Sequence, residues 1–108
     1  IHFTYNDTDM PLAPEIELAI YRIINELTNN TIKYAQARKI DIELMKYRDK
    51  VTIHYSDNGK GFDPEIAMKN KGSGLKNIKA RVDSFGGSFD IKSWKGQGTN
   101  ATITLLIK

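Results

Sequence analysis

The chain has 108 residues, of which 40% are hydrophobic and 27% are charged, the composition of one ordinary globular domain. It contains no cysteine, which excludes a disulfide framework and a thiolate metal site, and no apolar run approaches the roughly 20 residues that span a bilayer. The net charge is only +3, and acidic and basic residues alternate through most of the chain. We expect residues 1–108 to form a single domain, a fragment of a longer protein.

The first half of the chain predicts a short strand, a long helix and a hairpin. Residues 1–5 interleave apolar and polar side chains, and a connection leads to a helix that begins at Pro14. Apolar side chains recur in that helix every three or four positions, at Ile16, Ile20, Ile23 and Leu27. Residues 39–47 and 51–56 alternate apolar and polar side chains, which is typical of two strands joined as a β-hairpin.

The second half predicts two more helices and a closing hairpin. We expect a short helix from Pro64 to Met68 and an amphipathic helix from Leu75 to Phe85, which two glycines at 86–87 end. Residues 88–94 and 99–107 form the second predicted hairpin. The two hairpins disfavour an alternating parallel sheet. They predict an α+β fold, a two-layer sandwich whose mixed sheet carries its helices on one face.

The turn that follows the strand at 51–56 carries an acidic residue and two glycines, Asp57, Gly59 and Gly61. A carboxylate at the end of a strand can accept a hydrogen bond from a ligand amine, and glycines let a ligand approach the backbone closely. Taken alone, the same pattern also fits an exposed turn that leaves a strand. The turn is therefore a candidate site that needs support from elsewhere in the chain.

One edge of the long predicted helix is polar. Glu26, Asn30 and Lys33 lie within about 60° of one another on a helix that turns 100° per residue. Asn30 falls on or beside the buried face, where an amide is unusual. Its oxygen suits Mg²⁺, which uses few protein groups and keeps its waters and substrate phosphates. The alternative is a surface ion pair between Glu26 and Lys33, with Asn30 bonded to the backbone.

A glycine-rich segment, residues 72–74, precedes the second long helix. Free backbone N–H groups and the helix dipole favour an anion there, and the stretch from Lys69 to Arg81 contains bases but no acid. A plain loop is the alternative, since neither a P-loop nor a Rossmann fingerprint is present. An adenine nucleotide fits these requirements, because its exocyclic amine would donate to Asp57 while its polyphosphate bound magnesium. Guanine would place a carbonyl oxygen there.

Four segments in register resemble the ATP-binding (Bergerat) domain of sensor histidine kinases, in the GHKL superfamily shared with gyrase, the ninety-kilodalton heat-shock chaperone and MutL. ELTNNTIKY at 26–34 resembles the N box, and DNGKGF at 57–62 the first glycine box. GSGL at 72–75 resembles the second glycine box and GQGT at 96–99 the third. Residues 21–26 and the short lid at 62–71 are most similar to the subfamily related to nitrate/nitrite sensors.

The resemblance implies a role for each motif residue. Glu26 and Asn30 would be catalytic, Asn30 would also coordinate Mg²⁺, and Asp57 would bind the adenine amine. The other nucleotide-binding residues would be Lys33 and Tyr34 beside the phosphates, Gly59 and Gly61 around the adenine, Gly72, Gly74 and Leu75 at the phosphates, and Thr99 beside Asp57. Tyr34 stands where relatives often have histidine, and Thr31 where alanine is common.

The implied function is to bind MgATP and supply the γ-phosphate for autophosphorylation of a histidine on a separate dimerisation domain of the same protein. A response regulator would be the downstream partner, and no nucleic acid is expected. The acceptor histidine would lie outside this chain, because His2 and His54 fall in predicted strands. The resemblance also implies a cytoplasmic domain within a protein that is associated with a membrane.

Three other functions stay open. In hydrolysing relatives a glutamate at the position of Glu26 activates water, so an ATPase is the first of them. A nucleotide-binding domain without transfer activity is the second. The third is a nucleic-acid-binding module that uses the basic stretch from Lys69 to Arg81, although the chain lacks the strand-borne pair of aromatic residues of an RNA-recognition motif.

Overall fold

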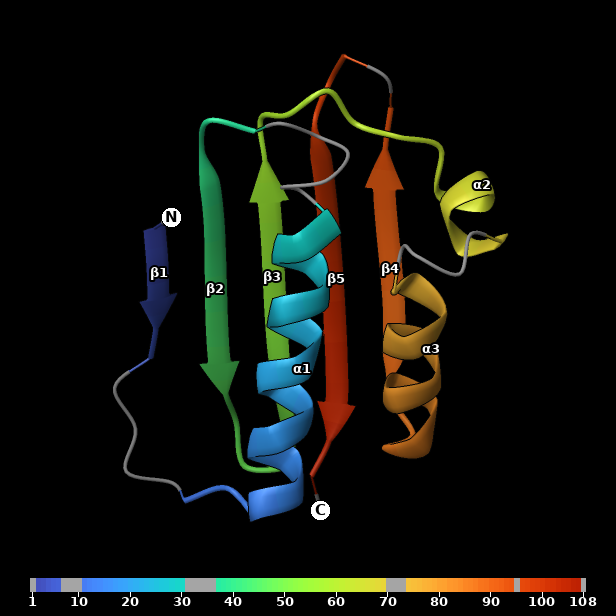
Figure 1. Cartoon of the computed structure of the whole chain (residues 1–108). Helices are drawn as coiled ribbons and strands as arrows, with labels where there is room; N and C mark the ends of the chain where they lie inside the picture. Colours follow the sequence, from blue (N-terminus) through green and yellow to red (C-terminus); the bar gives the residue numbers. More distant parts are fainter. Residues whose placement is uncertain (1, 7–10, 31–36, 70–73, 95, 108) are drawn as a thin grey trace.

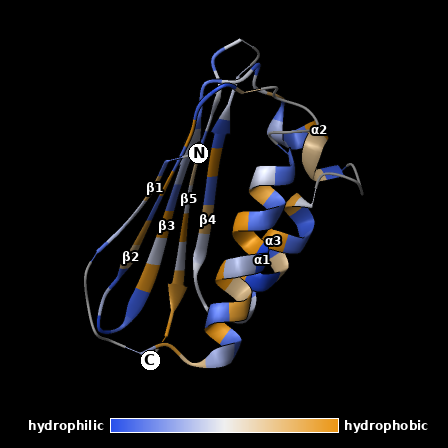
Figure 2. Cartoon of the chain, turned by 60° about the vertical axis from the view of Figure 1, so that its left-hand side comes forward, coloured by the Kyte–Doolittle hydropathy of each residue, from blue (hydrophilic) through white to orange (hydrophobic). Residues whose placement is uncertain are grey.

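The computed structural model describes residues 2–6, 11–30, 37–69, 74–94 and 96–107. In chain order, its elements are β1 (His2–Tyr5), α1 (Pro14–Asn30), β2 (Ile40–Lys46), β3 (Lys50–Asp57), α2 (Pro64–Lys69), α3 (Leu75–Ser84), β4 (Ser88–Ser93) and β5 (Thr99–Leu106). The strands form one five-stranded sheet in the order β1-β2-β3-β5-β4. All three helices lie on the same face of it (Figures 1 and 2). The predicted element order and two-layer α+β sandwich are confirmed.

The sheet is mixed because β1 runs parallel to β2, whereas every other neighbouring pair is antiparallel. The register matters for the site. Asp57, the last residue of β3, pairs with Thr99 at the start of β5, and Thr99 pairs in turn with Ser93 at the end of β4. Three polar residues from three strands are thereby fixed in one row at one end of the sheet.

The hydrophobic core lies between the sheet and the helices, as the orange stripes facing the sheet show in Figure 2. Helix α1 contributes the predicted apolar stripe, with Ile23 fully buried, and α3 contributes Leu75, Ile78 and Val82. Burying a side chain of this size contributes about 1.5–3 kcal/mol to the stability of the fold. These contacts hold the two helices against the sheet, where α3 lies over β4 and the neighbouring β5.

Local signals account for the helix ends. Helix α1 begins at Pro14, as predicted, with acidic residues in its first turn near the positive end of the helix dipole. Helix α3 ends at Ser84, one residue before the predicted end, because Phe85 leaves the helical conformation. Gly86 follows with a φ of 67°, a left-handed conformation that glycine adopts without strain. Among the described residues, no helix combines the length and apolar character that crossing a membrane requires.

Candidate functional site

The carboxylate of Asp57 is held at both of its oxygens. The backbone N–H of Gly59 donates to Oδ1 at 2.9 Å, and the hydroxyl of Tyr55 donates to Oδ2 at 2.7 Å. Each carboxylate oxygen has a second lone pair, so it can accept another hydrogen bond. The predicted site residue Asp57 is thus an oriented acceptor at the end of a central strand.

Tyr55 is the buried partner in this pair, with only 1% of its surface exposed. Burial, and then its hydrogen bond to Asp57, raise the pKa of the Tyr55 hydroxyl far above the ordinary value for tyrosine. The hydroxyl therefore stays protonated over the physiological pH range and acts as a donor to the carboxylate. Tyr55 is not among the site residues that the sequence predicts.

A second buried network lies next to Asp57, at Ser93. The Ser93 hydroxyl accepts a hydrogen bond from the Phe62 N–H at 2.8 Å, donates to the Gly98 carbonyl at 3.1 Å and lies 2.8 Å from the Thr99 hydroxyl. Since a serine hydroxyl carries one proton, its bond to Gly98 leaves Thr99 as the donor to Ser93. The Thr99 oxygen then presents lone pairs, like the carboxylate of Asp57 beside it.

The two glycine-bearing loops at 57–61 and 96–98 lie directly against each other. A Cβ atom on Gly61 would overlap the carbonyl oxygen of Trp94, and one on Gly98 would overlap that of Asp57. Both glycines have positive φ angles, 73° and 79°, which other residues rarely adopt. The Gly96 N–H also donates to the Lys60 carbonyl. Only glycine fits at 61 and 98, because the backbones pack too closely for a side chain.

Asn58 ties the same turn to the chain that precedes β2. Its side-chain oxygen accepts hydrogen bonds from the backbone N–H groups of Arg38 and Lys39 at 3.0 and 2.9 Å, and its own N–H donates to the Lys39 carbonyl at 3.2 Å. Contacts with the chain before β2 and with the segment between β4 and β5 therefore hold the turn around Asp57 in place. It is not the free surface turn that the sequence alone would also allow.

The second group of predicted residues lies where α1 ends and α3 begins, toward the same end of the sheet as Asp57 (Figure 1). Asn30 is 6% exposed and belongs to the buried stripe of α1, as predicted. A Cβ atom on Gly74 would overlap the carboxylate of Glu26, so this carboxylate lies against the start of α3. The side chain of Leu75 is fully buried, which leaves its backbone as the part that could contact a ligand.

Lys33, Tyr34 and Gly72, three of the predicted nucleotide-binding residues, lie outside the described residues. Within the ranges that the structure describes, no three or more histidine, aspartate or glutamate side chains gather in a way that could hold a metal ion. A magnesium site here would accordingly rest on Asn30 with few other protein ligands, the arrangement that Mg²⁺ tolerates when substrate phosphates and water complete its coordination.

A fixed acceptor at the end of β3, glycine loops packed against it and polar residues at the start of a helix are features of a nucleotide-binding α+β domain. The family model described as "Histidine kinase-, DNA gyrase B-, and HSP90-like ATPase" matches residues 15–108. The chain belongs to this family. The predicted resemblance to the ATP-binding domain of sensor histidine kinases is confirmed.

Two relatives from Bacillus subtilis (strain 168) are similar in sequence. The signal transduction histidine-protein kinase/phosphatase DegS is 39% identical over 93 residues, 84% of this chain and 24% of DegS. The sensor histidine kinase ComP is 38% identical over 90 residues, 82% of this chain and 12% of ComP. The chain thus spans a quarter or less of the length of these relatives.

Two solved structures share the fold. The histidine kinase domain of the Erythrobacter litoralis EL346 blue-light activated histidine kinase superposes with a TM-score of 0.72 at 16% identity, over 98% of this chain and 51% of that one. A longer chain of the same kinase gives a TM-score of 0.75 at 16% identity, over 98% of this chain and 34% of that one. The chain has the fold of a histidine-kinase ATP-binding catalytic domain.

Proposed function

We propose that residues 1–108 are one catalytic domain of a longer histidine kinase, which binds MgATP and supplies the γ-phosphate for autophosphorylation of a histidine on a separate domain. The observation that carries this proposal is the carboxylate of Asp57, oriented by two donors and placed beside Thr99 in the sheet register. Two neighbouring acceptors select a ligand that brings an amine, as adenine does. Guanine would bring a carbonyl oxygen to the same place.

The adenine would lie against the glycine loops around Gly59 and Gly61, which have no side chains to block its approach. The close packing of Gly61 and Gly98 on neighbouring backbone supports this arrangement, because it fixes the two glycine-bearing loops relative to each other. Thr99 would accept from the adenine amine directly or through a water molecule. Selectivity for the adenine base would then depend mainly on side chains that the sheet holds in place.

The phosphates would lie toward the start of α3, at Gly74 and the backbone of Leu75, where the positive end of the helix dipole favours an anion. Gly72, Lys33 and Tyr34 are proposed as further contacts on the strength of the family motifs. The amide oxygen of Asn30 would hold Mg²⁺, which fits its place at the end of α1, one turn beyond Glu26. When bound, this cation neutralises phosphate charge.

In this proposal phosphoryl transfer depends chiefly on positioning and charge neutralisation, so few residues need to act chemically. The acceptor histidine would come from the dimerisation domain. His2 and His54 are exposed residues of β1 and β3 and lie in strands instead of a dimerising helix. A cytoplasmic location and a response regulator as the downstream partner belong to the same proposal.

Hydrolysis of ATP is the second candidate function, and the position of Glu26 favours it. Glu26 is half-buried, and its carboxylate lies against Gly74, close to where the phosphates would bind. A carboxylate in that place could activate a water molecule. Phosphate release by this chain alone with MgATP, lost in Glu26→Gln, would support hydrolysis.

Incubating the full-length protein with γ-labelled ATP and magnesium tests the transfer. We expect acid-labile label on a histidine outside residues 1–108. Asn30→Ala should impair this magnesium-dependent step more than it impairs nucleotide binding, because Asn30 is assigned to the cation and not to the adenine. Equal binding and equal labelling in wild type and Asn30→Ala would remove Asn30 from the site.

A further inference from the structure

Asp57 receives its two described hydrogen bonds from different kinds of donor. The bond from the Gly59 N–H is local, and an aspartate that opens such a turn commonly makes it. The bond from the Tyr55 hydroxyl is a side-chain contact that depends on which residue stands two positions earlier in β3. Its length of 2.7 Å is typical of a hydroxyl donating to an ionised carboxylate.

The sheet fixes where the Tyr55 hydroxyl lies. Residues 55 and 57 point to the same face of β3, because side chains alternate along a strand. In the register, Tyr55 stands between Ile42 of β2 and Ala101 of β5, and the small side chain of Ala101 leaves room for the ring. The ring is held in the core and is 1% exposed, so its hydroxyl reaches the site from a rigid base.

We propose that Tyr55 is a positioning residue that orients the Asp57 carboxylate toward the ligand amine and thereby sets the preference for adenine. This inference rests on the proposed function and deepens it. The hydroxyl occupies one lone pair of Oδ2, while Gly59 occupies one of Oδ1. Two donors on different oxygens restrict rotation about the Cβ–Cγ bond, which is otherwise broad for aspartate, and so fix the plane of the carboxylate.

The consequence is specific to ligands that carry the amine. In Tyr55→Phe the ring and its packing remain, but Oδ2 loses the hydrogen bond from the Tyr55 hydroxyl, so the orientation of the carboxylate is less restricted. An adenine nucleotide then loses part of its hydrogen bond to Asp57. A purine nucleotide without the amine makes no such bond, so its affinity should not change. If Tyr55 had only a structural role, Tyr55→Phe would weaken the binding of both nucleotides equally.

The test compares ATP with purine riboside 5′-triphosphate, which has the same phosphates but no exocyclic amine, by calorimetric titration of this chain with magnesium. We expect wild type to prefer ATP, and Tyr55→Phe to reduce that preference about tenfold, the scale of one hydrogen bond to a charged group. Affinity for the purine nucleotide should stay unchanged, which also shows that the variant folds.

Tyr47→Phe is the matched control, because it removes the same atom from a residue that is 46% exposed at the other end of the β2–β3 hairpin. It should leave the preference unchanged. A second arm places Tyr55→Phe in an Asp57→Asn background, where the preference should fall no further, since Tyr55 acts through Asp57.

The possible results distinguish a failure of the positioning role of Tyr55 from a failure of the proposed function. If wild type prefers ATP and Tyr55→Phe keeps the full preference, the positioning role is wrong and the proposed function stands. If Tyr55→Phe weakens the binding of both nucleotides equally, Tyr55 stabilises the fold and does not select adenine. That result also overturns the inference. If wild type binds neither nucleotide, the proposed function fails, and the role of Tyr55 fails with it.

Discussion

The two ends of the candidate site are built differently. The sheet end, defined as Asp57, Gly61, Ser93 and Thr99, is held by strand pairing, by hydrogen bonds that link three strands and by the close packing of Gly61 on Trp94. The helix end, defined as Glu26, Asn30 and Gly74, is formed where two separate helices meet. Backbone pairing between strands fixes the sheet end directly, whereas the contact of Glu26 with Gly74 depends on how α1 and α3 pack. We infer that recognition of the base is preformed, whereas the phosphate end depends on how α3 sits against α1.

The comparison predicts that substitutions at the sheet end cost more stability than substitutions at the helix end. The largest loss is expected for Gly61→Ala, because its Cβ atom would overlap the Trp94 backbone and its φ is 73°. Overpacking against backbone and a left-handed alanine together should lower the free energy of unfolding by about 3 kcal/mol. Urea unfolding monitored by circular dichroism measures this change.

Gly96→Ala is the control for this substitution. Gly96 has a similar φ of 84°, but within the described part of the chain no atom is found within 4 Å of its would-be Cβ. It should cost about 1 kcal/mol, from the left-handed conformation alone. Equal losses in the two variants would mean that the contact between the glycine loops contributes nothing to stability.

Ser93→Ala should lower the free energy of unfolding by about 2 kcal/mol. The substitution leaves the Phe62 N–H without its partner and takes the described donor from the Gly98 carbonyl, in a region that is largely buried. Thermal or urea unfolding measures this change. The affinity for ATP should also fall, because the Thr99 hydroxyl loses its hydrogen bond to the Ser93 hydroxyl.

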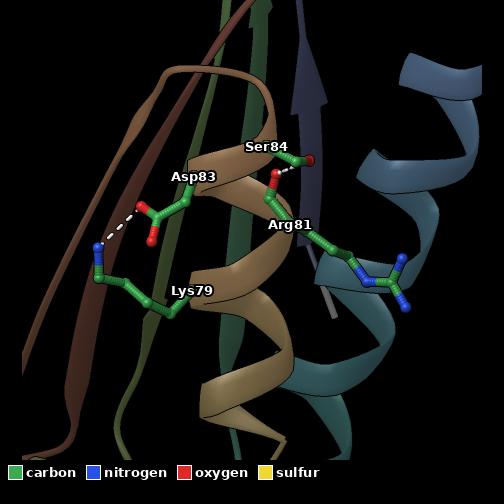
Figure 3. A network of polar contacts seen from close by, with 4 residues as sticks. All are labelled: Lys79, Arg81, Asp83 and Ser84. Atoms are coloured by element: carbon green, nitrogen blue, oxygen red, sulfur yellow. Dashed lines mark hydrogen bonds and ion pairs between the residues drawn. The ribbon is translucent and has the colours of Figure 1, made fainter.

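Ser84→Ala makes the same chemical change on the exposed end of α3, where the serine hydroxyl donates to the Arg81 carbonyl at 2.7 Å (Figure 3). Because that carbonyl is exposed and water can replace the hydroxyl, the loss should stay within about 0.5 kcal/mol. A Ser93→Ala variant as stable as Ser84→Ala would show that the sheet end is not braced by this network.

Gly74→Ala tests the helix end. The new Cβ atom would displace the carboxylate of Glu26, which is the flexible end of a side chain, so we expect only about 1–2 kcal/mol including the strain of a φ of 76°. In a Glu26→Ala background the overlap is gone, and the cost of Gly74→Ala should fall by about 0.5 kcal/mol or more. Strictly additive costs in this double-mutant cycle would contradict the contact between the two residues.

The smallest effect is expected for Lys79→Ala, which lies outside both ends of the site. Its ammonium pairs with Asp83 at 2.8 Å, one turn along α3, and both side chains are about half exposed (Figure 3). Such a pair contributes about 0.3–0.5 kcal/mol. A loss above 1 kcal/mol in 0.15 M salt would show that α3 depends on its surface charges more than on its buried face.

Much of the fold follows from the sequence because its signals are local. The three- and four-residue spacing in α1 and α3, and the alternation in the strands, predict the elements within a residue or two of their ends. The burial of Asn30 follows from the same periodicity. The turn at Asp57 was recognisable from its glycines and from three other motifs in register.

The partners of Asp57 do not follow from the sequence, because they depend on pairing between distant strands. Tyr55 has the pattern of an ordinary inward strand residue, and only the geometry reveals its hydroxyl at the carboxylate. The hydrogen bonds of Ser93 join chain segments up to 31 residues apart, and the contact of Glu26 with Gly74 requires two helices to be packed. The roles of Lys33, Tyr34 and Gly72 stay predictions.

Calorimetric titration of the chain with ATP and magnesium, for wild type and Asp57→Asn, tests the central claim most directly. We expect wild type to bind ATP and Asp57→Asn to bind it at least about tenfold more weakly, because an amide cannot accept at both positions and would turn a donor toward Tyr55, Gly59 or the adenine amine. If wild type binds neither ATP nor a close analogue, or if Asp57→Asn binds ATP as tightly as wild type, Asp57 does not select adenine and the account is wrong.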